Sequence, residues 1–237
     1  IYLTPFPLPL QAPYKIKKNG QIQQFVTPFT MAARSKKWYN KDNIYSKEAT
    51  LMEHTAKRAL VLAGGGAKGS YQIGVWRALQ ELDWTPDIIT GASVGTLNGC
   101  LFTMGKIQEA EDLWRSLEIH DVLEVPETLK PEELRPFFLD IIRSGGLNVE
   151  PLAETIDRLI DEDAVRHSPI HFGLVMTELG SLRSIQCPIE TIPEGQLKDY
   201  MLASSACFPA LRPREIDGVK YIDGGWRDNM PLDLAAQ

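Results

Sequence analysis

Short apolar runs alternate with segments of helical periodicity over residues 58–237. Residues 58–63 are almost wholly apolar, which is typical of a strand that is buried on both faces. Residues 70–82 then place apolar side chains on one helical stripe and predict an amphipathic helix. Pro86 ends the connection, and residues 87–90 predict a second short strand. The pattern therefore predicts a strand–helix–strand unit.

The same alternation continues along the chain. Helices are predicted through Leu97 and Leu101 and over residues 107–117, 132–143, 150–160 and 196–204, and strands over residues 171–177, 182–186 and 219–222. Strands that alternate with helices favour a sheet covered by helices. We therefore expect an α/β fold with three α/β/α layers and a mainly parallel central sheet.

Residues 1–55 differ from the rest in pattern and in charge. They contain five prolines and no sustained period, so we predict an irregular N-terminal extension before a folded domain over residues 56–237. Residues 1–58 hold ten Lys and Arg against three Asp and Glu, whereas residues 59–237 hold 15 against 28. A basic extension of this kind is either a solvated tail or a contact for anionic lipid. The pattern stops where another element is expected, which leaves open that the domain is truncated at its C-terminus.

The composition is that of an ordinary globular protein, with 43% hydrophobic and 24% charged residues. No apolar run reaches the roughly 18 residues of a membrane-spanning helix, and the first ten residues lack the basic flank of a signal peptide. Three scattered cysteines are too few for a disulfide framework or a zinc cluster. We therefore expect a cytoplasmic protein that uses no metal or other cofactor and has no nucleic-acid partner.

The first strand is followed by a glycine-rich turn, Gly64-Gly65-Gly66-Ala67-Lys68-Gly69. Its spacing matches the fingerprint of dinucleotide-binding proteins, but the second strand ends in Thr90-Gly91-Ala92-Ser93 and lacks the acidic residue that would hold the ribose. A nucleotide P-loop also fails, because Lys68 precedes Gly69 and no Gly-Lys-Ser/Thr follows. Two readings remain: a tight turn without a ligand, or a row of free backbone N–H groups that favours negative charge.

A second turn, Gly91-Ala92-Ser93-Val94-Gly95, follows the second strand and has the Gly-x-Ser-x-Gly pattern of a nucleophile elbow. Its outer residues, Gly91 and Gly95, must be glycines in such an elbow, because a Cβ atom there would collide with the adjacent strand or helix. The alternative is that Ser93 is a small residue in a packed turn. Neighbouring parallel strands end at one edge of a sheet, so we expect both turns to meet there. A serine hydroxyl beside backbone N–H groups can attack an ester and hold the oxyanion that forms.

The serine hydroxyl needs a base that removes its proton. His120 and His167 lie in acidic stretches, His171 opens a strand, and the last 66 residues contain no histidine, so a Ser-His-Asp triad is disfavoured. Asp223 is the better candidate, because it ends the last predicted strand and two glycines follow it. If that strand neighbours the elbow strand, the carboxylate can accept the proton directly. An ordinary Asp-Gly turn is the alternative reading of Asp223, and Asp228 is a fallback base.

Together, these segments resemble the patatin-like phospholipase family. The family pattern is a glycine-rich oxyanion loop with Arg or Lys before its last glycine, then Gly-x-Ser-x-Gly, then Asp-Gly-Gly or Asp-Gly-Ala. The chain has these motifs in this order at residues 64–69, 91–95 and 223–225. The supporting similarities are Thr96-Leu97-Asn98-Gly99, Ala203-Ser204-Ser205-Ala206, Phe208-Pro209 and Asp228-Asn229-x-Pro231. The resemblance covers about residues 58–235.

The resemblance implies a Ser93–Asp223 dyad without histidine, which hydrolyses acyl esters of lipids through an acyl-enzyme. It also implies that backbone N–H groups of residues 64–67, chiefly those of Gly65 and Gly66, hold the oxyanion. The expected partner is a lipid or phospholipid, with peripheral contact to a membrane.

The chain departs from the family pattern at two positions. Ala63 stands where many relatives have Asp, and Lys68 replaces the arginine of many relatives, which puts bidentate hydrogen bonding by that residue in doubt. Two alternatives to hydrolysis share the same turns. One is acyl transfer to an acceptor other than water, and the other is a non-catalytic lipid-binding module.

Overall fold

The structure is a computed structural model that describes residues 57–124, 126 and 131–237. The predictions for residues 1–55, an irregular and basic extension, lie outside the described residues. Within the described part of the chain, no helix is both long enough and apolar enough to cross a membrane.

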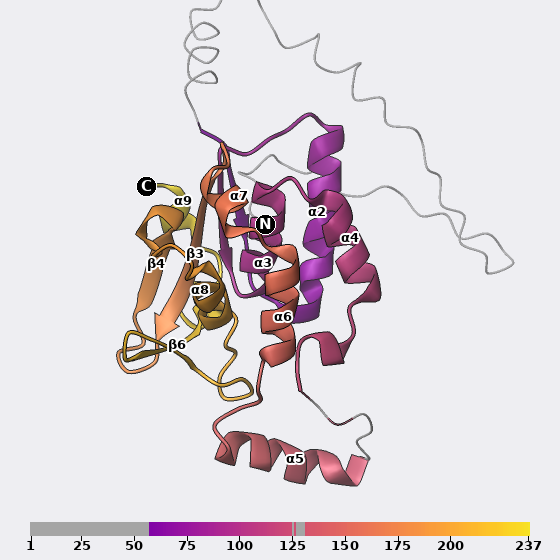
Figure 1. Cartoon of the computed structure of the whole chain (residues 1–237), viewed down its shortest axis with the longest axis vertical. Coiled ribbons are helices and arrows are strands. Elements are labelled where there is room, and N and C mark those ends of the chain that lie inside the picture. The colour runs from indigo at the N-terminus through magenta and orange to yellow at the C-terminus, as the bar shows by residue number, and fades with distance from the viewer. Residues whose placement is uncertain (1–56, 125, 127–130) are drawn as a thin grey trace, which may run out of the picture. The chain divides into compact units, whose positions relative to one another are not determined.

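A six-stranded mixed sheet lies at the centre of the described residues (Figure 1). Its strands are β1 (Ala59–Leu62), β2 (Ile88–Ala92), β3 (His171–Glu178), β4 (Ser184–Pro188), β5 (Arg214–Ile216) and β6 (Val219–Asp223). Strands β1, β2 and β3 are parallel neighbours. Strands β4 and β6 pair antiparallel with β3, and β5 pairs antiparallel with β6. The predicted parallel arrangement is confirmed for the strands that precede the two glycine-rich turns.

Strand β3 brings the ends of β2 and β6 together. Residues 171–175 of β3 pair with β2, and Ala92 lies opposite Val175. The next residue, Met176, pairs with Asp223 at the end of β6. Because β4 occupies the other edge of β3 here, β2 and β6 share one edge and run toward each other. The carboxyl ends of these two strands therefore meet at one point of the sheet.

Helices cover both faces of the sheet (Figure 1). They are α2 (Gly69–Glu81), α3 (Val94–Thr103), α4 (Ile107–Ser116), α5 (Pro131–Arg143), α6 (Glu150–Leu159), α7 (Glu162–Arg166), α8 (Leu197–Ser204) and α9 (Leu232–Ala235). Leu174 and Met176 of β3 belong to the main apolar core, which α3 and α8 cover. Val175 packs on the opposite face with Ala92 and with Leu234 of α9. The predicted α/β fold with helices on both sides of the sheet is confirmed.

Strand β5 and helices α7 and α9 were not predicted from the sequence. Strand β5 pairs with β6 across a two-residue turn in which Asp217 and Gly218 have φ angles of 50° and 77°. Asp-Gly is a strong hairpin signal, so the sequence did contain the information for this hairpin. Helices α7 and α9 have five and four residues, which is too short for a clear apolar period.

Candidate active site

Ser93 lies in the sharp turn between β2 and α3, with a φ of 54° and a ψ of −128°. This is a strained conformation for a residue with a side chain. A Cβ atom on Gly91 would lie 2.5 Å from the carbonyl oxygen of Gly95, and one on Gly95 would lie 2.2 Å from that of Leu62. These are the collisions expected of a nucleophile elbow, in which only glycine fits on either side of the serine.

The buried side chain of Ser204, at the end of α8, anchors the elbow. Its Oγ accepts a hydrogen bond from the Ser93 N–H at 3.0 Å and donates one to the carbonyl oxygen of Val175 at 2.7 Å. Since the proton of this hydroxyl is directed at Val175, the Thr96 hydroxyl donates to the Ser204 oxygen, at 3.0 Å. One fully buried hydroxyl therefore joins the elbow, α3 and β3.

Asp223 ends β6, and it lines the same cavity as Ser93. The residue is only 7% exposed. Its Oδ1 accepts the Gly225 N–H at 2.7 Å, and the Ser93 hydroxyl lies near enough to stabilise the ionised carboxylate. Burial raises the pKa of Asp223, and the Ser93 hydroxyl and the Gly225 N–H oppose that rise because they stabilise the ionised form. A raised pKa suits a carboxylate that must take up a proton during a reaction.

The first glycine-rich turn lies beside Ser93, where residues 64–67 line a cavity. The Gly64 N–H is not free, because it donates a hydrogen bond to Oδ1 of Asn229 at 3.0 Å. Among the described residues, the N–H groups of residues 65–67 have no protein acceptor. Three backbone donors, those of residues 65–67, are therefore available next to the serine. The sequence motif, residues 64–69, had suggested a larger number of donors.

Lys68 and Gly69, the last two residues of the motif, do not line the cavity in the described part of the chain. The buried Gly69 instead offers its carbonyl oxygen to Nδ2 of Asn98 at 3.0 Å. Asn98, fully buried in α3, also donates to Oε1 of Gln72 at 2.8 Å and accepts from Nε1 of Trp114 at 2.9 Å. This network ties the first turn to the helix that follows the elbow. The sequence marked Asn98 only as part of a resemblance.

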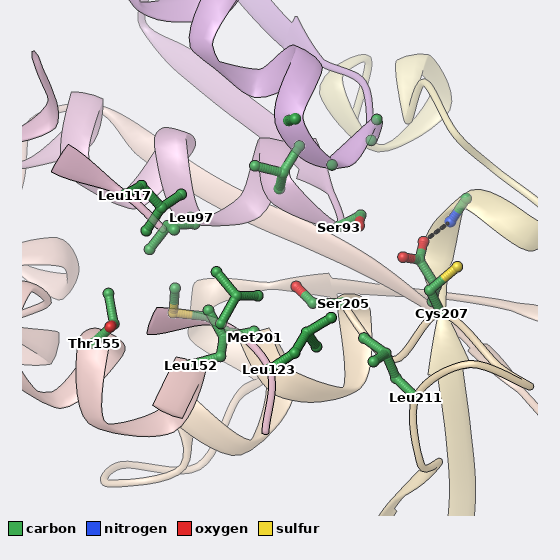
Figure 2. Close-up of a pocket in the computed structure, with 18 of the residues that line it drawn as sticks. Ser93, Leu97, Leu117, Leu123, Leu152, Thr155, Met201, Ser205, Cys207 and Leu211 are labelled. Carbon is green, nitrogen blue, oxygen red and sulfur yellow. Dashed lines mark hydrogen bonds between the residues drawn. The ribbon is translucent and has the colours of Figure 1, made fainter. Parts of the chain in front are cut away.

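A cavity of about 920 Å³ opens beside Ser93 and Asp223. Figure 2 shows side chains from α3, α6 and α8 around one hollow next to Ser93. The apolar side chains that line the cavity include Leu97, Leu117, Leu123, Leu152, Ile156, Met201 and Leu211. A few polar groups beside a largely apolar wall are typical of a small-molecule site. This arrangement suits a ligand that has a reactive polar group and a long apolar chain.

The histidines that follow Ser93 in the sequence lie elsewhere. His120, His167 and His171 are exposed, and none of them is among the described residues that line the cavity. His171 is the first residue of β3, at the end of that strand opposite to the Ser93 turn. The fallback base Asp228 is also absent from the described cavity wall. Of these candidate bases in the described part of the chain, only Asp223 lines the cavity that Ser93 also lines.

The sequence matches the model of one protein family, described as patatin-like phospholipase, over residues 60–236. An uncharacterized NTE family protein of Mycobacterium bovis is 29% identical over 174 residues, which are 73% of this chain and 44% of that protein. Patatin-like phospholipase domain-containing protein 7 of Rattus norvegicus is 27% identical over 180 residues, which are 75% of this chain and 12% of that protein.

The fold is similar to that in the crystal structure of VipD from Legionella pneumophila, with a TM-score of 0.50 and 19% identity over 74% of this chain and 47% of that chain. At this identity the likeness concerns the fold alone. The chain spans less than half the length of the two relatives from Mycobacterium bovis and Rattus norvegicus, at 44% and 12%.

Proposed function

Because the chain belongs to the patatin-like phospholipase family, we propose that it hydrolyses acyl esters of lipids, with Ser93 as the nucleophile and Asp223 as its base. The observation that carries this proposal is that Ser93 and the buried Asp223 line the same apolar cavity, with the hydroxyl near enough to the carboxylate to stabilise its ionised form. A carboxylate that comes within hydrogen-bonding reach of the hydroxyl can remove its proton, so the proposed reaction needs no histidine.

In the first half of the proposed reaction, Oγ of Ser93 attacks the carbonyl carbon of the ester and its proton passes to Asp223. The carbonyl oxygen becomes an oxyanion, which the N–H groups of residues 65–67 stabilise. The C–O bond to the alcohol then breaks, and the leaving oxygen takes the proton from Asp223. The products of this half are a free alcohol or lysolipid and an acyl group on Ser93.

In the second half, water attacks the acyl-enzyme. Asp223, ionised again after the first half, accepts a proton from the water as its oxygen bonds to the acyl carbon. The same N–H groups stabilise the second oxyanion. When the bond to Oγ breaks, Asp223 returns the proton to Ser93 and the fatty acid leaves. The dyad is then ready for another cycle.

The apolar wall of the cavity supports a fatty acyl chain as the group that binds next to Ser93. Each buried methylene group contributes about 0.8 kcal/mol of binding free energy. A chain of eight or more carbons therefore gains several kcal/mol if it lies along residues such as Leu97, Leu152 and Met201. We propose a phospholipase A or lysophospholipase type of substrate on this basis.

The test combines an active-site probe with product analysis. A fluorophosphonate probe should label the wild-type protein but not the Ser93→Ala variant, whereas Ser116→Ala, on the exposed surface of α4, should be labelled normally. Mass spectrometry of lipid incubations should show fatty acid released by the wild type and by Ser116→Ala only. If the wild-type protein is neither labelled nor active on any lipid, it is not a serine lipid hydrolase.

The rim of the cavity supports a peripheral contact with a lipid surface. Ile119 and Trp226 both line the cavity, yet they are 59% and 55% exposed, which places them at its opening. Large apolar side chains at an opening can enter the interface of a bilayer, and tryptophan is especially suited to that position. We propose that this rim meets the lipid surface, so that an acyl chain enters the cavity without crossing water.

Vesicle binding tests the proposed contact. The Ile119→Ser/Trp226→Ser double variant should sediment less with phospholipid vesicles and hydrolyse them more slowly, while keeping its rate on a short, soluble ester. Leu82→Ser is the matched control, because Leu82 is 71% exposed at the end of α2 and does not line the cavity within the described residues. Equal vesicle binding by the wild type and the double variant would exclude this rim as the contact.

A further inference from the structure

One side chain joins the two loops of the candidate site. Asn229 lies in the segment that follows β6, and its Oδ1 accepts the Gly64 N–H at 3.0 Å. Both residues line the cavity that Ser93 also lines. The two partners are 165 positions apart, so this hydrogen bond is a tertiary contact. It connects the oxyanion loop directly to the segment that carries Asp223.

The carboxamide oxygen of Asn229 lies between two glycines, one from each loop. A Cβ atom on Gly64 would lie 2.7 Å from this oxygen, and one on Gly225 would lie 2.8 Å from it. Gly225 is also the residue whose N–H donates to Oδ1 of Asp223 at 2.7 Å. The oxygen of Asn229 therefore packs against the oxyanion loop on one side and against the turn that orients the carboxylate on the other.

We infer that Asn229 is a positioning residue, whose carboxamide oxygen holds the oxyanion loop in register with Asp223. The effect of Asn229 on catalysis rests on the proposed function, whereas the hydrogen bond between Asn229 and Gly64 can be tested without any activity. Fixing the Gly64 N–H sets the direction of the next three N–H groups, those of residues 65–67. An oxyanion hole depends on the direction of its N–H groups, since a misplacement of about 1 Å can lower the rate by a factor of about 100.

Position 229 requires a hydrogen-bond acceptor without a charge, and asparagine supplies one whereas aspartate does not. Oδ1 of Asn229 lies 2.8 Å, and Oδ1 of Asp223 3.0 Å, from the same Cβ position on Gly225. The two side chains are therefore within about 6 Å, a range in which one charge shifts the pKa of another. A neutral acceptor holds the loop without making the nearby carboxylate harder to ionise.

Amide hydrogen exchange tests the contact itself. In the Asn229→Ala variant, the Gly64 amide loses its acceptor and should exchange at least about ten times faster than in the wild type. Asn229→Asp keeps an acceptor oxygen and should retain the protection. Unchanged exchange in Asn229→Ala would overturn the inference, whether or not the protein hydrolyses lipids.

Kinetics on a soluble ester test the effect of Asn229 on catalysis. Asn229→Ala should lower kcat about tenfold with little change in KM, and should leave the acid limb of the pH–rate profile in place. Asn229→Asp should recover most of kcat at high pH, but its acid limb should lie at least about half a pH unit higher, because the added carboxylate ionises before the buried Asp223. The other titratable or charged groups of the surrounding loops are the same in every variant: Lys68, Cys207, Arg227 and Asp228.

A matched charge control is Gln80→Glu, which adds the same charge on the exposed surface near the end of α2 and should not move the pH profile. If both Asn229 variants lose kcat equally and neither moves the acid limb, the side chain is only structural and the inference is wrong. A wild-type protein inactive on every ester would refute the proposed function, and the exchange measurement would still decide the role of Asn229.

Discussion

Ser204→Ala removes the one hydroxyl on which the backbone of the elbow depends. The change leaves the Ser93 N–H without its acceptor and the Val175 carbonyl without its side-chain donor, and it also removes the acceptor of the Thr96 hydroxyl. An unsatisfied buried polar group costs about 1–3 kcal/mol. The Thr96 hydroxyl can rotate to another acceptor, so we count two groups. The expected loss is roughly 2–6 kcal/mol of the free energy of unfolding.

Urea denaturation measures this loss, with a lower midpoint and an unchanged slope as the expected result. Since 1 kcal/mol shifts Tm by about 2–4 °C in a domain of this size, Tm should fall by roughly 4–24 °C. Ser205→Ala is the matched control, because the Ser205 hydroxyl makes no hydrogen bond to another described residue, and its change should stay within about 0.5 kcal/mol. If Ser204→Ala also loses less than about 0.5 kcal/mol, the buried junction does not hold the elbow and the reasoning fails.

Three further predictions concern the base, the histidines and the acyl wall. Asp223→Asn should abolish turnover and raise the free energy of unfolding at pH 7. Because folding raises the pKa of Asp223, the wild type loses stability as pH rises from the ordinary aspartate pKa through the folded one. The stability that the variant gains over the wild type should therefore vanish near pH 3. Because protonated Asp223 cannot act as a base, kcat/KM should fall as pH drops through its raised pKa. A value of kcat/KM that is unchanged down to pH 4 would contradict the role of Asp223 as the base. Alanine at His120, His167 or His171 should leave turnover intact, and lost activity in a well-folded His171→Ala variant would restore the triad. Ile156→Trp should slow hydrolysis of long-chain p-nitrophenyl esters at least about tenfold relative to acetate, because the indole fills the apolar part of the cavity; an equal effect at all chain lengths would contradict the acyl wall.

The elements around the two glycine-rich turns were predictable because their signals are local. The apolar runs before the turns and the amphipathic stripe of α2 lie within about 25 residues of one another, and the structure has them within a residue or two. Asp223 stood out because two glycines follow a strand. The role of Asp223 as a base was predicted on the condition that its strand neighbours the elbow strand. In the structure β6 instead meets β2 end to end along β3, because the register of β3 places Val175 and Met176 beside the two strand ends.

The sequence near the side chains that hold the site in place does not predict their contacts. Ser204 reaches the elbow across 111 positions, and Asn229 reaches Gly64 across 165. Hydrogen bonds over such separations depend on the packing of α8 and on the path of the chain after β6, which apolar periodicity does not specify. The sequence showed these residues only as parts of resembling segments. Their roles follow from the three-dimensional contacts.

The strain at Ser93 gives a test that separates backbone from side-chain effects. Ser93→Gly and Ser93→Ala both remove the hydroxyl, so the difference between them reports on the backbone. At an unstrained position, glycine is less stable than alanine by about 0.4–1 kcal/mol, because it loses more conformational entropy on folding. At Ser93, with a φ of 54° and a ψ of −128°, alanine bears a strain of about 1–3 kcal/mol that glycine does not. Ser93→Gly should therefore be the more stable variant in urea denaturation, by about 1 kcal/mol at the midpoints of these two ranges. The usual order, with alanine more stable, would show that the elbow stores no strain.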